Sequence, residues 1–214
     1  MRSLSSLVGV VNKNKKSRAA GLVKLRMREF RAFRKAGNKE LFGELCFCLL
    51  TANYSAEGGI KVQCAVGDGF ISLPEFALAK KLRACGYRFP NVRAKYIVEA
   101  RKHKNKLREL LGSFGSEKEA REWLVKNVKG IGWKEASHFL RNVGYEDVAI
   151  VDFHIIDLLK KHNLLDKEIR KGALTEKKYL EIERILSELA KRAKTSLAEL
   201  DLYLWFEETG KVLK

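Results

Sequence analysis

The sequence contains little cysteine, and its cysteines do not form the close pairs that metal and redox sites use. There are four in 214 residues, Cys46, Cys48, Cys64 and Cys85. None of them forms a C-x-x-C pair, so we expect reduced thiols that are mostly buried. On this basis we expect neither a bound metal nor a cofactor.

The sequence also lacks a long hydrophobic run. No apolar stretch approaches the roughly 20 residues that a membrane-spanning helix needs. Residues 1–6 lack the hydrophobic region of a signal peptide and are followed by a basic segment. We therefore expect no membrane partner and a cytoplasmic protein.

Acidic residues are scarce relative to basic ones. The chain has 26 Asp and Glu residues against 43 Lys and Arg residues, which gives a formal net charge of +17. Many of the basic residues fall within 13–35 and 93–108. Most of them are expected to be solvated, but the imbalance indicates a polyanionic partner, with binding that weakens steeply as salt rises.

Alternating strand patterns and internal repeats are absent too, and the periodicity is helical almost throughout. The fold class is therefore predicted to be all-α. Helices are expected at about 20–35, 39–52, 55–67, 74–85, 91–111, 117–128, 133–143, 153–162, 175–193 and 197–209. Capping boxes of the form S-x-x-E begin at Ser72, Ser116 and Ser196. Gly86, Gly112 and Gly144 stand where helices are expected to stop.

The most informative motif is Gly130-Ile131-Gly132, which lies between two of the expected helices. Glycines permit a tight turn with positive φ angles and let the chain approach a ligand closely. Such a hairpin can present backbone N–H groups to a phosphate. The plain alternative is an ordinary helical turn that only packs, because a glycine pair alone is weak evidence.

Lys134 follows this turn at the start of a helix. A lysine attacks a sugar carbon only as the neutral amine. The first turn of a helix disfavours a cation, and positive charge from Lys126 and Lys129 would act in the same direction. Partial burial beside Trp133 would favour the amine further. The alternative is a solvated surface lysine.

Asp152 stands 18 residues after Lys134, at the end of the apolar run 148–151. It is expected to be the N-cap of the next helix, where a carboxylate is stabilised as the anion. A fixed anion beside a sugar would also favour the positive charge that develops when a glycosidic bond breaks. Capping alone would account for the residue equally well.

Together, these residues resemble the helix-hairpin-helix base-excision DNA glycosylases. The resemblance covers about residues 40–160 and implies a nucleophilic Lys134, a charge-stabilising Asp152 and a DNA-binding hairpin. Lys129 departs from the family pattern, which usually has proline there, but a lysine suits a phosphate-binding turn. His154 matches a position that helps to hold the DNA backbone, and Asn53 one that fills the space left by a flipped base. Ordinary surface and capping roles remain open for His154 and Asn53.

The resemblance also implies an architecture. It predicts two helical subdomains flanking a cleft, within a single glycosylase unit that spans residues 1–214. The central subdomain is expected at about 38–128, and the second from about 1–37 together with 129–214. The hairpin would lie at the cleft. The expected partner is double-stranded DNA with a damaged base, bound by a monomer and, in a prokaryotic cell, at the nucleoid.

Within this superfamily, the chain looks most like the archaeal-type (type 2) 8-oxoguanine DNA glycosylases. It has no cysteine after Cys85, so it cannot carry the iron–sulfur loop of the endonuclease III kind. The resemblance implies a bifunctional enzyme that forms a Schiff base and nicks the strand by β-elimination. Phe89, Trp205 and Lys214 are the expected base-pocket residues, with core aromatics and a frayed terminus as the plain alternatives.

Two other functions remain open at this point. One is a glycosylase for an oxidised pyrimidine or an alkylated purine, because Lys134 and Asp152 do not distinguish the lesion. The other is a non-catalytic DNA-binding module that uses the hairpin only to hold phosphate.

Overall fold

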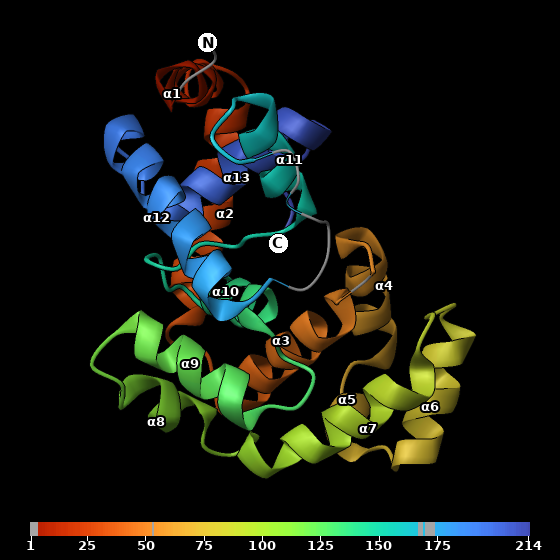
Figure 1. The fold of residues 1–214 in the computed structure, drawn as a ribbon. Coiled ribbons are helices and arrows are strands. Elements are labelled where there is room, and N and C mark those ends of the chain that lie inside the picture. The colour runs from red at the N-terminus through yellow and green to blue at the C-terminus, as the bar shows by residue number, and fades with distance from the viewer. Residues whose placement is uncertain (1–3, 53, 167–168, 170–173) are drawn as a thin grey trace. The chain divides into compact units, whose positions relative to one another are not determined.

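The computed structural model describes residues 4–52, 54–166, 169 and 174–214. Across these residues every regular element is a helix, which confirms the all-α expectation (Figure 1). None of the described helices is long and apolar enough to span a membrane. The chain divides into two compact units, residues 32–143 and residues 1–31 with 144–214.

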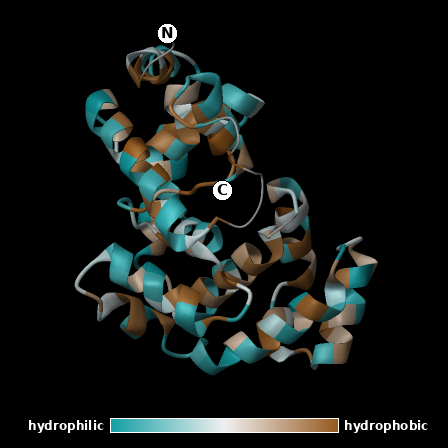
Figure 2. Cartoon of the chain, in the orientation of Figure 1, coloured by the Kyte–Doolittle hydropathy of each residue, from teal (hydrophilic) through white to brown (hydrophobic). Residues whose placement is uncertain are grey.

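The unit of residues 32–143 is built around one buried helix. Its helices are α3 (Asn38–Thr51), α4 (Ala56–Val66), α5 (Gly69–Ser72), α6 (Glu75–Ala84), α7 (Pro90–Ala100), the 3₁₀ turn η1 (Arg101–His103), α8 (Leu107–Gly112), α9 (Glu117–Asn127) and α10 (Trp133–Asn142). α3 is buried from Glu44 to Thr51, and α4, α7, α8 and α10 pack against it. A helix that is apolar on nearly all sides must lie inside a core, and Figure 2 shows hydrophobic colour along α3.

The second unit combines the two ends of the chain. It contains α1 (Leu4–Asn14), α11 (Phe153–Lys161), α12 (Glu176–Ala193) and α13 (Leu197–Thr209), together with most of α2 (Ala19–Phe33). α1 packs on α12 and α13, and α11 packs on α13. The Asn14 amide donates to Glu207 Oε2 at 2.9 Å, so a side chain from α1 also fastens the end of α13.

The helix α1 was not predicted. Its apolar stripe rests mainly on Leu7 and Val11, which are fully buried. So short a stripe gains most of its stability from tertiary packing against α12 and α13 rather than from local propensity. The sequence of residues 4–14 therefore gave little local indication of a helix.

The expected helix at 91–111 is interrupted, because distant groups hold its middle in another conformation. Arg101 donates to the carbonyls of Phe70 and Leu73 at 2.8 and 2.7 Å. Asn38 accepts from the Arg108 N–H at 2.8 Å, and thereby caps the start of α8 from 70 residues away. The single helix is replaced by α7, η1 and α8.

At two of the three expected capping boxes, the serine caps its helix. Ser116 and Ser196 accept from the N–H groups of Glu119 and Glu199, at 3.2 and 3.1 Å. The prediction at Ser72 was wrong. Ser72 is the last residue of α5, where its hydroxyl donates to the carbonyl of Asp68, and Pro74 is the N-cap of α6.

Gly86 and Gly144 end helices with φ angles of +74° and +88°, as expected. A helix also stops at Gly112, which is the last residue of α8. All four cysteines are free, but only Cys46 and Cys48 are buried, fewer than expected.

The boundary between the units also differs from the expected one. We expected residues 129–143 to belong to the subdomain that contains both chain ends, whereas the structure groups them with residues 32–128. The reason is packing, because α10 lies against α3 and α9.

Candidate active site

The glycine hairpin connects α9 to α10, and Gly130 makes its turn. Gly130 has a φ angle of +87°, in the region that favours glycine. A Cβ atom at this position would lie 2.3 Å from Cδ2 of Tyr96, a residue of α7. Both the backbone conformation and the close approach of the aromatic ring therefore require glycine.

Gly132 differs from the expectation of a positive φ angle. Its φ and ψ angles are −99° and −175°, and it is the N-cap of α10. An N-cap residue has extended backbone, which any residue can adopt. The prediction was wrong because Gly132 starts the helix rather than forming part of the turn.

Lys129 lies on the aromatic ring that supports the hairpin. Its Nζ is 5.7 Å from the centroid of Tyr96 and 3.6 Å from Glu99 Oε1. Arg93 lies over the same ring at 5.6 Å. Two basic side chains therefore lie near the Tyr96 ring, and one of them, Lys129, directly precedes Gly130.

Lys134 is the second residue of α10, as expected. Its side chain is 27% exposed, and Nζ lies 3.5 Å from Oε1 of Glu135. The other oxygen of Glu135 accepts from the Gly132 N–H at 3.3 Å. Glu135 thus ties the amine to the hairpin backbone.

The electrostatic surroundings of Lys134 differ in part from the expectation. Lys126 and Lys129, which were expected to disfavour its ammonium form, are themselves paired with Glu122 and Glu99. Glu135 also places a carboxylate beside the Lys134 amine, which the sequence did not indicate.

A buried arginine packs against the start of α10. Arg121 of α9 is 1% exposed, and its guanidinium lies 4.8 Å from the centroid of the Trp133 ring. It also donates to Ser137 Oγ at 3.3 Å. A planar cation stacked on an indole fixes the residue that stands next to Lys134.

Asp152 is the N-cap of α11, as expected. Its Oδ1 accepts from the Ile155 N–H at 2.9 Å. Within the described part of the chain, Oδ2 makes no hydrogen bond or ion pair. One oxygen therefore holds the helix, and the other remains available to a substrate.

His154 and Trp205 are brought into contact in the unit that contains both chain ends. Their ring centroids are 4.7 Å apart and nearly perpendicular, at 85°. The half-exposed Phe153 ring also lies against His154, with a centroid distance of 4.0 Å. Trp205 Nε1 is buried and has no hydrogen-bond partner among the described residues. Lys214 is partly buried, four residues beyond the Gly210 that ends α13.

Phe89 belongs to the other unit, at the N-cap of α7. Its ring is 39% exposed, and the Arg88 guanidinium lies 5.0 Å from its centroid. An exposed aromatic is suited to stacking on a base. Asn53, the expected space-filling residue, lies outside the described residues.

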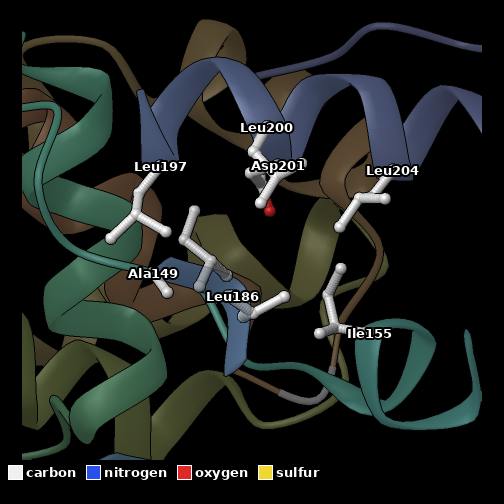
Figure 3. Close-up of a pocket in the computed structure, with 8 residues that line it drawn as sticks. Ala149, Ile155, Leu186, Leu197, Leu200, Asp201 and Leu204 are labelled. Carbon is white, nitrogen blue, oxygen red and sulfur yellow. The ribbon is translucent and has the colours of Figure 1, made fainter. Parts of the chain in front are cut away.

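One small pocket lies in the unit that contains both chain ends, and its lining is apolar except for Asp201 (Figure 3). Its lining consists of Ala149, Ile150, Ile155, Leu186, Leu197, Leu200, Asp201 and Leu204. None of the expected base-pocket residues lines it. Its lining suits a packing gap in the core rather than a site for a polar purine.

Three residues that shape the site were missed from the sequence. Tyr96 of α7 approaches Gly130, which lies far along the chain, and Arg121 of α9 contacts Trp133 of α10. A sequence carries no local signal for contacts between separate helices. Glu135 had a signal, because it stands three residues after the N-cap Gly132, where glutamate often caps a helix.

A lysine that begins the helix after a glycine hairpin, followed by a capping aspartate, defines the class of helix-hairpin-helix glycosylases. The family model of 8-oxoguanine DNA glycosylase matches residues 23–195. The chain belongs to the 8-oxoguanine DNA glycosylase family. This finding confirms the resemblance expected from the sequence.

Relatives match over nearly their whole length. The 8-oxoguanine DNA glycosylase/AP lyase of Korarchaeum cryptofilum is 52% identical over 211 residues, with 99% of each chain covered. The protein of the same name from Methanocaldococcus jannaschii is 51% identical over 208 residues, which cover 97% of this chain and 99% of the relative. These matches agree with the archaeal type that the sequence indicated.

Solved structures match equally well. The crystal structure of the M. jannaschii 8-oxoguanine glycosylase/lyase in complex with a 15mer DNA containing 8-oxoguanine has a TM-score of 0.94 and 51% identity, and covers 97% of this chain and 99% of that one. The 8-oxoguanine DNA glycosylase of Thermotoga maritima has a TM-score of 0.92 and 47% identity, with 99% and 100% of the two chains covered.

Proposed function

We propose that this protein removes 8-oxoguanine from double-stranded DNA and then nicks the abasic strand, with Lys134 as the nucleophile. The observation that carries the assignment is the place of Lys134. It is a partly exposed amine in the first turn of the helix that follows the Gly130 turn. Membership of the 8-oxoguanine DNA glycosylase family and the names of its relatives support the same activity.

The chemistry requires the free amine. Lys134 attacks C1′ of the damaged nucleotide, the bond from C1′ to the base breaks, and the base leaves with the electron pair and takes up a proton. The lysine nitrogen then loses a proton, the C1′–O4′ bond breaks, O4′ takes up a proton, and C1′ and the nitrogen form the C=N bond of a Schiff base. Removal of a proton from C2′ then expels the 3′ phosphate, which completes β-elimination.

The other residues are assigned supporting roles. The anion of Asp152 stabilises positive charge on the sugar while the glycosidic bond breaks, with Oδ1 held by the helix and Oδ2 available. Lys129, Gly130 and Gly132 bind a phosphate of the DNA backbone, since they surround the turn before a helix start. His154 holds the backbone near Asp152.

The base pocket is assigned to Phe89, Trp205 and Lys214. An extruded purine needs aromatic faces to stack on, which Phe89 and Trp205 supply. The Trp205 N–H makes no hydrogen bond with any described residue, so we assign it as a candidate donor to the base. Asn53 fills the space that the extruded base leaves.

Reductive trapping tests the nucleophile. Borohydride added during reaction with a duplex that contains one 8-oxoguanine should yield a covalent complex, and Lys134→Gln should abolish it. Lys126→Gln is the matched control, because Lys126 is an exposed lysine of the neighbouring helix. A complex that persists in Lys134→Gln would show that another lysine is the nucleophile.

Excision assays test the lesion. Duplexes that carry one 8-oxoguanine, one oxidised pyrimidine or one alkylated purine are compared at equal concentration. Excision of 8-oxoguanine opposite at least one base is expected. Absence of cleavage opposite every partner base would contradict the lesion assignment.

A further inference from the structure

The segment before Asp152 is fastened to α12 by two buried side chains. The Tyr179 hydroxyl donates to the carbonyl of Ala149 at 2.7 Å and accepts from the Val151 N–H at 3.2 Å. Glu183 Oε2 accepts from the Ala149 N–H at 2.9 Å. Three successive polar groups along one edge of this segment are therefore bound by side chains of one helix.

The spacing of the helix matches the spacing of the segment. Tyr179 and Glu183 are four residues apart and so lie on one face of α12, about 6 Å apart along its axis. Ala149 and Val151 are two residues apart, about 6.6 Å in an extended chain, and their polar groups point to the same side. Two side chains one turn apart on α12 can therefore hydrogen-bond to the polar groups of Ala149 and Val151 along the same edge of the segment.

These hydrogen bonds form where water is excluded. Tyr179 and Glu183 are 2% and 4% exposed, and residues 148–151 are all buried. A buried backbone group that loses its partner there has no water to replace it. The hydroxyl of Tyr179 is therefore a strong constraint on the backbone of Ala149 and Val151.

The segment also packs against apolar side chains. The small pocket in Figure 3 is lined by Ala149 of the segment, by Ile155 of α11 and by Leu186 of α12. Apolar packing has no preferred direction, whereas hydrogen bonds are directional. The hydrogen bonds from α12 therefore set the orientation of the polar groups of Ala149 and Val151.

We propose that Tyr179 and Glu183 are positioning residues for Asp152. Val151 directly precedes Asp152, and the Ile155 N–H holds Oδ1 from the other side. Two sets of hydrogen bonds therefore fix the carboxylate: those from α12 to the preceding segment, and the one from the first turn of α11 to Oδ1. This inference rests on the proposed role of Asp152 in base release.

Tyr179→Phe tests the inference, because it removes the hydroxyl and keeps the buried ring. Single-turnover excision of 8-oxoguanine should slow about tenfold, while the Kd for lesion duplex stays within about twofold, as expected for a displaced catalytic group. Tyr203→Phe is the matched control. Tyr203 is buried in the same unit, and its hydroxyl makes no hydrogen bond with any described residue. Equal excision rates in the two variants would overturn the inference.

A double-mutant cycle shows whether Tyr179 acts through Asp152. In the Asp152→Asn background, the effect of Tyr179→Phe should fall below about twofold, because coupled residues are not additive. A full tenfold effect in that background would overturn the inference while leaving the role of Asp152 intact. An undiminished rate in Asp152→Asn alone would instead overturn the proposed role of Asp152, and this inference with it.

Conservative replacement at Glu183 gives a separate readout. Glu183→Gln keeps an oxygen that can accept from the Ala149 N–H, so it should excise at near the wild-type rate. Glu183→Ala removes the acceptor and should slow excision, at a temperature where thermal melting shows both variants folded. Equal loss in both variants would overturn the positioning role of Glu183.

Discussion

The carboxylate of Glu135 joins the amine of Lys134 to the backbone of the hairpin. Oε1 lies 3.5 Å from Lys134 Nζ, and Oε2 accepts from the Gly132 N–H at 3.3 Å. An anion in this place restrains the lysine and also occupies a backbone donor that a DNA phosphate would use. The same contact therefore bears on both proposed roles, the attack by Lys134 and the binding of phosphate by the hairpin.

Glu135→Gln is expected to speed reductive trapping. The amide can still accept from the Gly132 N–H, but it no longer holds the Lys134 amine in an ion pair. For a partly exposed pair, the gain should be about two- to fivefold, measured as the trapping rate with saturating DNA. A slower rate in Glu135→Gln would show that the carboxylate is needed for the attack itself.

Asp152 variants separate helix capping from chemistry. Asparagine and serine are both good N-caps, so Asp152→Asn and Asp152→Ser should preserve the melting temperature and the Kd for DNA. Loss of the anion should slow base release about 100-fold in both. Asp152→Ala should show the same kinetic loss and, in addition, about 1 kcal/mol lower stability. Undiminished turnover in Asp152→Asn would contradict the electrostatic role.

Gly130 and Gly132 should respond differently to alanine. Gly130→Ala places a Cβ at a φ angle of +87° and against Tyr96, and should lower stability by at least about 1–2 kcal/mol and weaken DNA binding. Gly132→Ala is the matched control, because its backbone is extended and its new Cβ would meet only the flexible end of Glu135, at 3.1 Å. Equal losses, measured by urea unfolding and fluorescence anisotropy, would contradict this account of the turn.

The buried His103 is expected to make the folded protein less stable in acid. Burial lowers its pKa below the usual 6.5, the backbone of Asn127 opposes this shift, and the charges of Lys102 and Lys106 add to it. The unfolded chain therefore binds a proton at pH values where the folded protein does not. The stability from the neutral imidazole is complete above about pH 6.5 and decreases as the pH falls below it.

Urea unfolding at pH 7.5 and 5.5 measures this effect. The decrease in unfolding free energy between the two pH values should be smaller in His103→Gln than in the wild type. The substitution also changes the packing against Trp123, whose ring lies 5.0 Å from that of His103. This packing change affects stability equally at both pH values, so it cancels when the two decreases are compared. The same decrease in both proteins would assign the acid sensitivity to other groups.

Features that depend on three or four neighbouring residues were predictable from the sequence. The caps at Ser116, Ser196 and Asp152 were found correctly, because each side chain reaches an N–H group three residues ahead. Gly144 was found for a similar reason, since a helix that ends in a left-handed residue favours glycine.

Features that depend on distant contacts were not predictable. Nothing within residues 91–111 indicated the break that Arg101 and Asn38 impose. Nothing around Gly130 indicated that Tyr96 would press against it. Gly132 was placed in the turn because spacing does not distinguish a turn residue from an N-cap.

By itself, the sequence determined the all-α class, the polyanion-binding charge, the hairpin and the identity of Lys134 and Asp152 as the candidate reactive pair. These properties follow from residue type and from spacing along the chain. Only the tertiary structure decided that Glu135 holds the amine and that Tyr179 and Glu183 hold the segment before Asp152. The direction of a side chain is set by the groups packed around it, and those groups come from parts of the chain that sequence spacing does not connect.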